Sequence, residues 1–276
     1  MGKEEKLTII DGSSLIYSAC HNMAKDMKTT DDYRYYREAL DRYIQSILED
    51  TKADLYVIYG DQNSSYRKRL FEDFKADRLK RSYLKFKNDL TQYANTNLGF
   101  YNHPDLEADD LCLLTHDMYK DKYNITIASK DSDLRQYSAN FFNYGIYGKG
   151  KVEDGFENIS EIEAWFNLWR SVLVKGHNNK LDYLEGCGLQ TAESYLKLWK
   201  HEQYPYAVLK AFLNGIESNR EKNIKREIKG YNFPRGMDKF NKSFQQTYLF
   251  RTLDEINSLN IYFYPPSFRK NPYSLW

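Results

Sequence analysis

Hydrophobic and polar positions in the first half of the chain alternate between short β-branched runs and longer segments with helical spacing. The apolar runs LTII, LYVIYG and NITIAS occupy residues 7–10, 55–60 and 124–129, and an aspartate closely follows each. The intervening segments, such as 33–50 and 109–123, have a helical pattern. Strand, helix and strand at this spacing predict an α/β fold with a central, mostly parallel sheet covered by helices on both faces.

The pattern changes after about residue 150, where strand signals fade and helical segments dominate. The segments 159–176 and 191–216 show this helical pattern. We therefore predict a core over 1–150 and a helical region over 151–276. Residues 217–236 are rich in charge and predict an exposed loop between helices. The tail 263–276 is either a packed terminus or a docking peptide.

Composition narrows the class of protein. The 276 residues carry a formal net charge of +1, which argues against a protein that coats polyanions generally. The three cysteines are far apart and form no CxxC pair, so we expect buried, reduced thiols. No signal peptide is evident, and no apolar run approaches the ~18 residues that span a bilayer. We expect a soluble cytoplasmic monomer with no membrane partner.

Seven acidic residues are predicted to converge. Acids follow the three strand candidates, and the carboxyl ends of parallel strands share one edge of a sheet. Three more acids crowd into LEADD, ahead of an apolar helical run. Helix capping explains one acid there, but many carboxylates in one cleft raise one another's pKa values unless cations accompany them. The predicted group is Asp11, Asp61, Glu107, Asp109, Asp110, Asp131 and Asp133.

The ligand chemistry of this group indicates the metal and the reaction. Oxygen ligands without a His or Cys cluster favour Mg²⁺, with Mn²⁺ as a substitute, over zinc. Two such ions ~3.5 to 4 Å apart activate water and stabilise the leaving oxygen in phosphodiester hydrolysis. Phosphotransfer of the haloacid dehalogenase type needs a second aspartate where Ser13 stands, and a Walker phosphate loop is missing. Hydrolysis of nucleic acid is therefore predicted.

A basic segment interleaved with aromatic residues spans 64–88. Cations that follow phosphates and aromatic rings that stack on bases are typical of a channel for single-stranded nucleic acid. An amphipathic surface helix with a solvated basic face is the alternative. Lys75 and Arg78 are our candidates for stabilising charge at the scissile phosphate. The predicted strand-binding residues are Tyr66, Arg67, Lys75, Arg78, Lys80, Arg81 and Tyr83.

The segment 184–196, LEGCGLQTAESYL, predicts a helix, a tight glycine turn and a second helix. Gly186 and Gly188 permit close backbone approach, and the amides that begin the second helix can hold a phosphate of duplex DNA. Gln190 and Thr191 lie at that helix start. A GxG sequence also occurs at helix junctions that bind nothing, so the signal is weak by itself.

The ordered set IIDGSS, YGD, YRKRLFEDFKADR, EADD, SKDSD and GCGLQTA resembles the flap endonuclease and 5′-3′ exonuclease family, which includes bacteriophage 5′ nucleases, over roughly residues 7–195. The resemblance implies a PIN-like three-layer fold and a Mg²⁺-dependent nuclease. It also implies a helical arch at about 62–95 and a helix-hairpin-helix at about 173–200, with K⁺ as in relatives. Asp11, Asp61, Glu107, Asp109 and Asp110 match the first-metal set, and Asp131 with Asp133 match half of the second.

One segment departs from the family pattern. In GHNNKLDYLEG, His177 and Lys180 stand where the family has the two remaining acids of the second metal site. Asp182 is a substitute if the backbone shifts. Otherwise Lys180 stands in for part of the cation's charge, and His177 contacts phosphate or is structural.

The resemblance implies a 5′ nuclease that acts on DNA or RNA/DNA hybrids with free 5′ ends or flaps. Primer or flap removal in replication, with replication proteins as partners, would be its setting, in the host cytoplasm if the chain is phage-encoded. Two alternatives stay open. One is a structure-specific nucleic-acid-binding protein whose catalysis has lapsed, and the other is a PIN-type ribonuclease.

Overall fold

The computed structural model describes residues 5–26, 33–62, 64–71, 84–146, 155–174 and 182–273. Its strands are β1 (Lys6–Asp11), β2 (Leu55–Gly60), β3 (Tyr101–Asn102), β4 (Asn124–Ala128), β5 (Ala139–Phe142), β6 (Phe156–Ile159) and β7 (Arg269–Lys270). Its α-helices are α1 (Gly12–Asp26), α2 (Tyr33–Asp50), α3 (Tyr66–Leu70), α4 (Leu84–Asn97), α5 (Ala108–Tyr119), α6 (Glu161–Leu173), α7 (Leu189–Leu196), α8 (Tyr204–Asn214), α9 (Arg235–Thr247) and α10 (Leu253–Asn257). Short 3-10 turns are η2 (Ser132–Gln136), η3 (Tyr144–Ile146), η5 (His201–Gln203) and η6 (Arg220–Lys222).

The strands form one sheet in the order β3-β2-β1-β4-β5-β6, and β7 pairs with β2 at its start. The pairs from β3 to β5 are parallel, whereas β6 and β7 run antiparallel to their neighbours. The strands predicted at 7–10, 55–60 and 124–129 are confirmed, and so is the mostly parallel sheet. Because β1 lies between β2 and β4, its last residue, Asp11, stands at the centre of the carboxyl edge.

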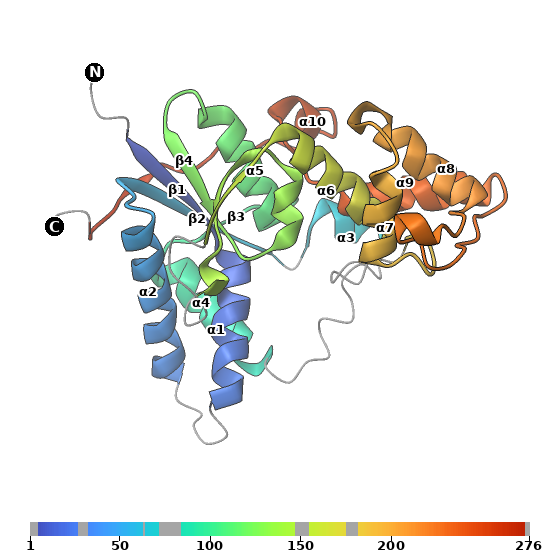
Figure 1. Ribbon diagram of the computed structural model, residues 1–276. Helices are drawn as coiled ribbons and strands as arrows, with labels where there is room; N and C mark the ends of the chain where they lie inside the picture. Colours follow the sequence, from blue (N-terminus) through green and yellow to red (C-terminus); the bar gives the residue numbers. More distant parts are fainter. Residues whose placement is uncertain are drawn as a thin grey trace.

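Helices cover both faces of the sheet, as predicted (Figure 1). Leu7 and Ile9 of β1 pack on one face with α5 and with residues 249–263. Ile10 points to the other face, where α1, α2 and α4 pack. The alternation of side chains along β1 therefore supplies both cores, because successive residues of a strand face opposite sides of the sheet.

Helices α6 to α9 enclose a separate apolar core beside the sheet (Figure 1). These helices confirm the helical pattern predicted for 159–176 and 191–216. The charged segment 217–236 is largely exposed, but Ile224 and Ile228 are buried and two isolated β-bridges order it. The boundary near residue 150 stays a prediction, and the edge strands β6 and β7, which follow it, belong to the sheet.

The tail is anchored to the rest of the protein at several points between residues 263 and 271, although residues between these points are exposed. Phe263 is buried against the sheet, and the Phe268 ring lies 4.9 Å from that of Tyr119. Strand β7 then pairs with β2. These contacts favour the packed terminus over the docking peptide.

Two expectations from composition can be compared with the structure. Cys20, Cys112 and Cys187 are buried thiols outside any disulfide, as predicted. Within the described ranges, no helix combines the length and apolar character needed to cross a bilayer.

Ile9→Ala should destabilise the fold, because Ile9 is fully buried in the central strand and truncation leaves a cavity. We expect the free energy of unfolding in urea to fall by about 2 to 5 kcal/mol. Ile162→Ala is the control, since that side chain is 55% exposed and its loss should change stability by at most about 0.5 kcal/mol. Equal effects of the two substitutions would contradict this assignment of the core.

Candidate functional site

Asp11 is a buried carboxylate at the end of β1. Its Oδ1 accepts a hydrogen bond from the Ser14 amide at 3.0 Å, and its Oδ2 accepts one from Ser129 Oγ at 2.7 Å. Burial, together with the charges of Asp131 and Asp61, outweighs the lowering effect of the Ser14 and Ser129 hydrogen bonds and raises the pKa of Asp11 from its ordinary value near 3.8 to about 7. Ionised Asp11 is therefore held at a cost that a nearby cation would reduce.

Asp61 connects the end of β2 to the first turn of α5. Its Oδ1 accepts a hydrogen bond from the Ala108 amide at 2.8 Å. This contact satisfies one of the free amides at the helix start. It also brings Asp61 beside Glu107, Asp109 and Asp110, here called the acid triplet. Burial, followed by the charges of four acids, raises the pKa of the Cys112 thiol inside α5. Those acids are Asp11, Asp109, Asp61 and Asp110, which shows that they lie around the same part of the helix.

Asp131 caps η2, and a single hydroxyl joins it to Asp11. The Asp131 side chain accepts a hydrogen bond from the Asp133 amide at 3.0 Å. The Asp131 amide in turn donates to Ser129 Oγ at 3.0 Å, and the same hydroxyl donates to Asp11. Ser129 therefore fixes the loop after β4 against the end of β1.

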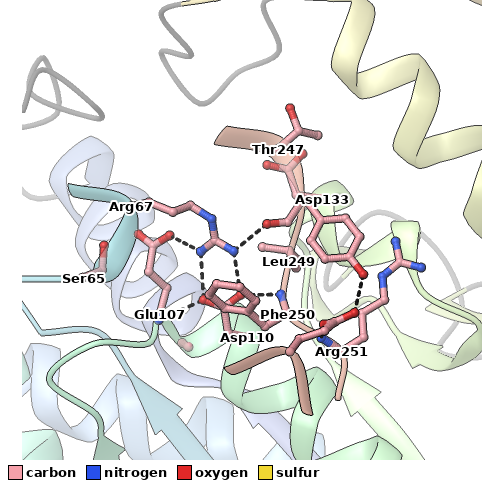
Figure 2. Close-up of polar contacts among 12 residues, drawn as sticks. Ser65, Arg67, Glu107, Asp110, Asp133, Thr247, Leu249, Phe250 and Arg251 are labelled. Atoms are coloured by element: carbon pink, nitrogen blue, oxygen red, sulfur yellow. Dashed lines mark hydrogen bonds and ion pairs between the residues drawn. The ribbon is translucent and has the colours of Figure 1, made fainter. Parts of the chain in front are cut away.

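Arg67 is the buried counter-charge of two acids of the triplet. Its side chain is 3% exposed, and its Nη1 lies 2.9 Å from Glu107 and 2.8 Å from Asp110 (Figure 2). Its Nη2 donates to Asp110 at 2.6 Å and to the carbonyl of Tyr248 at 2.7 Å. Burial alone would lower the pKa of Arg67, but the charges and hydrogen bonds of Asp110 and Glu107 raise it above its usual value.

The buried position of Arg67 shows that its predicted role was wrong. We predicted that Arg67 contacts nucleic acid, but its guanidinium is buried inside the protein and bound to carboxylates. The sequence also predicts metal ions as the counter-charge of Glu107, Asp109 and Asp110. For Glu107 and Asp110 that expectation was incomplete, because an arginine of the same chain neutralises them.

Asp110 illustrates the consequence for metal binding. Besides Arg67, it accepts hydrogen bonds from the amides of Glu107 at 3.2 Å and Phe250 at 2.9 Å. Four donors use the four acceptor positions of a carboxylate. The assignment of Glu107 and Asp110 as metal ligands stays a prediction, and it now requires Arg67 or an amide to share them.

Other predicted residues have different surroundings. Tyr66 is half-buried, and its ring lies 5.8 Å from that of Phe250. Asp182 pairs with Lys239 at 3.1 Å, so it already has a cationic partner. The remaining candidates, Lys75, Arg78, Lys80, Arg81, Tyr83, His177 and Lys180, lie outside the described residues.

The glycine turn before α7 is exposed. Gly186 has a φ of +80°, a conformation that favours glycine. Gly188 is the N-cap of α7, and no atom lies within 4 Å of the position that a Cβ would take there. Gln190 is exposed and Thr191 is half-buried in the first turn of α7. The nucleic-acid contacts assigned to these four residues stay predictions.

The donors of the acid group fit a hard divalent ion in kind. They are carboxylate oxygens, and the like charges of Asp61 and Asp131 raise the pKa of the buried Asp11. In the part of the chain that the structure describes, no three His, Cys, Asp or Glu side chains form a group that could hold a metal ion as they stand.

Sequence reasoning missed Arg135, which supports the loop carrying Asp131. Its guanidinium is buried and donates to the carbonyls of Ser129 at 3.1 Å and Asp131 at 2.8 Å. It also pairs with Glu157 of β6 at 3.0 Å. The motif SKDSDLRQ contains this arginine, but an arginine after a turn is usually solvent-exposed, so its sequence gave no signal of burial.

The fold and the site together define an α/β protein with an acidic group at the carboxyl edge of a mostly parallel sheet. The family model of the 5′-3′ exonuclease N-terminal resolvase-like domain matches residues 6–156, more than half of the chain. The chain therefore belongs to this family, and the resemblance read from its motifs is confirmed.

Solved structures of bacteriophage T5 proteins share the fold. A T5 protein co-crystallised with metal ions and the T5 flap endonuclease in a pseudo-enzyme-product complex with DNA and metal ions each give a TM-score of 0.62 at 13% identity, over 88% of this chain and 89% of theirs. The T5 5′-exonuclease with bound zinc gives a TM-score of 0.59 at 13% identity, over 88% of this chain and 86% of that chain. At this identity the likeness concerns the fold, and it confirms the predicted α/β class with a mostly parallel central sheet. The helical arch and the helix-hairpin-helix stay predictions. None of the curated proteins compared matches the chain.

Asp11→Asn should flatten the pH dependence of stability in EDTA. The folded-state pKa of Asp11, about 7, lies above its ordinary value near 3.8. Between pH 3.8 and about pH 7 the folded protein therefore binds more protons than the unfolded protein. The free energy of unfolding falls as the pH rises through this range. Asparagine does not titrate, so urea denaturation across this range should show a smaller fall in the variant.

Asp254→Asn is the control for this experiment. Asp254 is an exposed acid of α10 outside the acid group, and its replacement should keep the wild-type slope. A wild-type slope in Asp11→Asn as well would contradict the raised pKa.

Proposed function

We propose that the protein is a metal-dependent 5′ nuclease that hydrolyses phosphodiesters of DNA or RNA/DNA hybrids from a free 5′ end or flap. One observation carries the proposal: a buried acid at the centre of the sheet edge lies among like charges in a chain of the 5′-3′ exonuclease family. The T5 neighbours, which were crystallised with metal ions and with DNA, support it.

Mg²⁺ is the proposed metal, with Mn²⁺ as a substitute. Bound ions of this kind generate hydroxide from water and stabilise the leaving oxygen. Asp11, Asp61 and Asp109 would hold the first ion, and Glu107 and Asp110 would reach it only while shared with Arg67. Asp131 and Asp133, on the loop held by Ser129 and Arg135, would hold the second ion.

The rest of the chain would bind the nucleic acid. Lys75 and Arg78 would offset the negative charge at the scissile phosphate. The segment 64–88, apart from the buried Arg67, would form the path of the single strand. The turn at Gly186 and Gly188 would hold the duplex, with K⁺ as a bound ion. Primer or flap removal during replication, by a monomer that meets other replication proteins, is the proposed setting.

A second candidate function is structure-specific binding without catalysis. The pairing of Asp182 with Lys239 favours it, because the acid that was to replace the missing second-site ligand is already neutralised. Incubating a 5′-flap substrate with and without Mg²⁺ or Mn²⁺ separates the two candidates by the presence of product. A PIN-type ribonuclease would instead prefer single-stranded RNA when RNA and the flap compete.

Asp109→Ala should lower the rate of Mg²⁺-dependent flap cleavage by more than about 100-fold, because the substitution removes a proposed metal ligand. Binding of the flap, measured by fluorescence anisotropy in EDTA, should change little. Asp117→Ala is the matched control: Asp117 lies on the same helix but pairs with Lys120 at the surface, and its cleavage rate should equal that of the wild type. Full cleavage by Asp109→Ala would refute the assignment.

A further inference from the structure

Residues 247–250, here called the strap, run from the end of α9 toward α10 and contact Asp110, of the acids at 107–110, and Gln136, which bonds to Asp133 of the acids at 131–133. On one side the strap contacts the acid triplet. The Tyr248 carbonyl accepts a hydrogen bond from Arg67 at 2.7 Å, and the Phe250 amide donates to Asp110 at 2.9 Å. Figure 2 shows Arg67, Glu107 and Asp110 gathered beside the strap.

On its other side the strap contacts Gln136, the last residue of η2. Gln136 is 1% exposed, and its Nε2 donates to the Thr247 carbonyl at 3.1 Å and to the Asp133 carbonyl at 2.9 Å. Its Oε1 accepts a hydrogen bond from the Leu249 amide at 3.3 Å. Gln136 therefore ties the strap to the turn that carries Asp133.

The strap's polar main-chain groups alternate between the two sides. Residues 247 and 249 bond to Gln136, and residues 248 and 250 bond to Arg67 and Asp110. All four contacts use main-chain atoms of the strap, and the side chains that meet them are buried. Displacing the strap would leave buried polar groups unsatisfied on both sides, so the two sides are expected to move together.

We propose that Arg67 and Gln136 are positioning residues that set the separation between the acids at 107–110 and those at 131–133 by holding the same strap from opposite sides. The metal part of this inference rests on the proposed function. Two-metal hydrolysis needs its ions within ~4 Å of each other, so the separation of their ligands matters. Residues behind metal ligands commonly change metal affinity by ~10- to 100-fold when replaced.

A purely structural strap is the competing explanation. Leu249 is buried in the core under α5, so the strap also helps to close that core. Loss of stability alone cannot separate the two explanations. Metal affinity and the coupling of one side of the strap to the other can.

The test uses Arg67→Lys and Gln136→Ala in the full chain. Lysine keeps the charge but loses the two-pronged contact with Asp110. Arg37→Lys is a matched control, because Arg37 makes a similar two-pronged pair with Asp89 away from the strap. Gln245→Ala, an exposed glutamine of α9, controls for the loss of an amide side chain.

Mn²⁺ binding without DNA, followed by calorimetry, is the first measurement. We expect each positioning variant to bind Mn²⁺ roughly 10-fold or more weakly. The Mg²⁺ concentration for half-maximal flap cleavage should rise in parallel, and both controls should match the wild type. Lower stability with unchanged Mn²⁺ affinity in both variants would overturn the positioning role.

Amide hydrogen exchange in EDTA is the second measurement. It tests whether a substitution on one side of the strap changes the exchange of an amide on the other side. Arg67→Lys should speed exchange at Leu249, whose own partner Gln136 is intact, and Gln136→Ala should speed exchange at Phe250, whose partner Asp110 is intact. Exchange that changes only on the mutated side would overturn the shared strap. If Arg67→Lys does not fold, the effect of Gln136→Ala on Phe250 decides.

The two measurements also separate this inference from the proposed function. A wild-type protein that neither binds Mn²⁺ nor cleaves the flap would refute the proposed function, and with it the metal part of the inference. The exchange experiment would still decide whether the strap couples its two sides.

Discussion

The ion pairs between Arg67 and the carboxylates of Glu107 and Asp110 are the interaction on which the site depends. Desolvating three charges is costly, and the cost is offset only where the geometry is good and the remaining polar positions are filled. Here the guanidinium forms a two-pronged contact with Asp110, and main-chain groups complete the set. Since removing one member would strand buried charge, α3, the start of α5 and the strap are held in one arrangement.

Arg67 divides the acid group into two parts: the two carboxylates that its charge neutralises, Glu107 and Asp110, and the other acids. Glu107 and Asp110 are neutralised within the chain, whereas Asp11 receives hydrogen bonds from a backbone amide and a hydroxyl and has a raised pKa. A cation from solution would gain most beside Asp11, because burial and the like charges of Asp131 and Asp61 disfavour its ionised form. The division explains how consecutive acids can stand next to an apolar helix. Their repulsion is relieved partly by the protein and partly, under the proposed function, by metal.

The features that could be predicted from the sequence are those with a local signal. The runs before Asp11 and Asp61 are β-branched and end in acids, so the central strands and their shared edge followed from the pattern. Strands β3 and β7 have two residues each and are ordered by pairing with β2, so no periodicity marks them. The burial of Arg67 was invisible because an arginine in a basic run resembles any surface cation. Its carboxylate partners lie 40 and 43 positions away.

The strap was invisible for a different reason. Its contacts with Arg67, Gln136 and Asp110 use main-chain atoms, which every residue except proline can supply in full. Such contacts constrain the path of the strap and the identity of the side chains that meet it, but they leave the strap's own sequence free to vary. Because the strap begins at the last residue of α9, the helical region that would hold duplex DNA is joined to the acid group by a segment that is held from both sides. The sequence of the strap can therefore change while the end of the helical region keeps its place beside the acids.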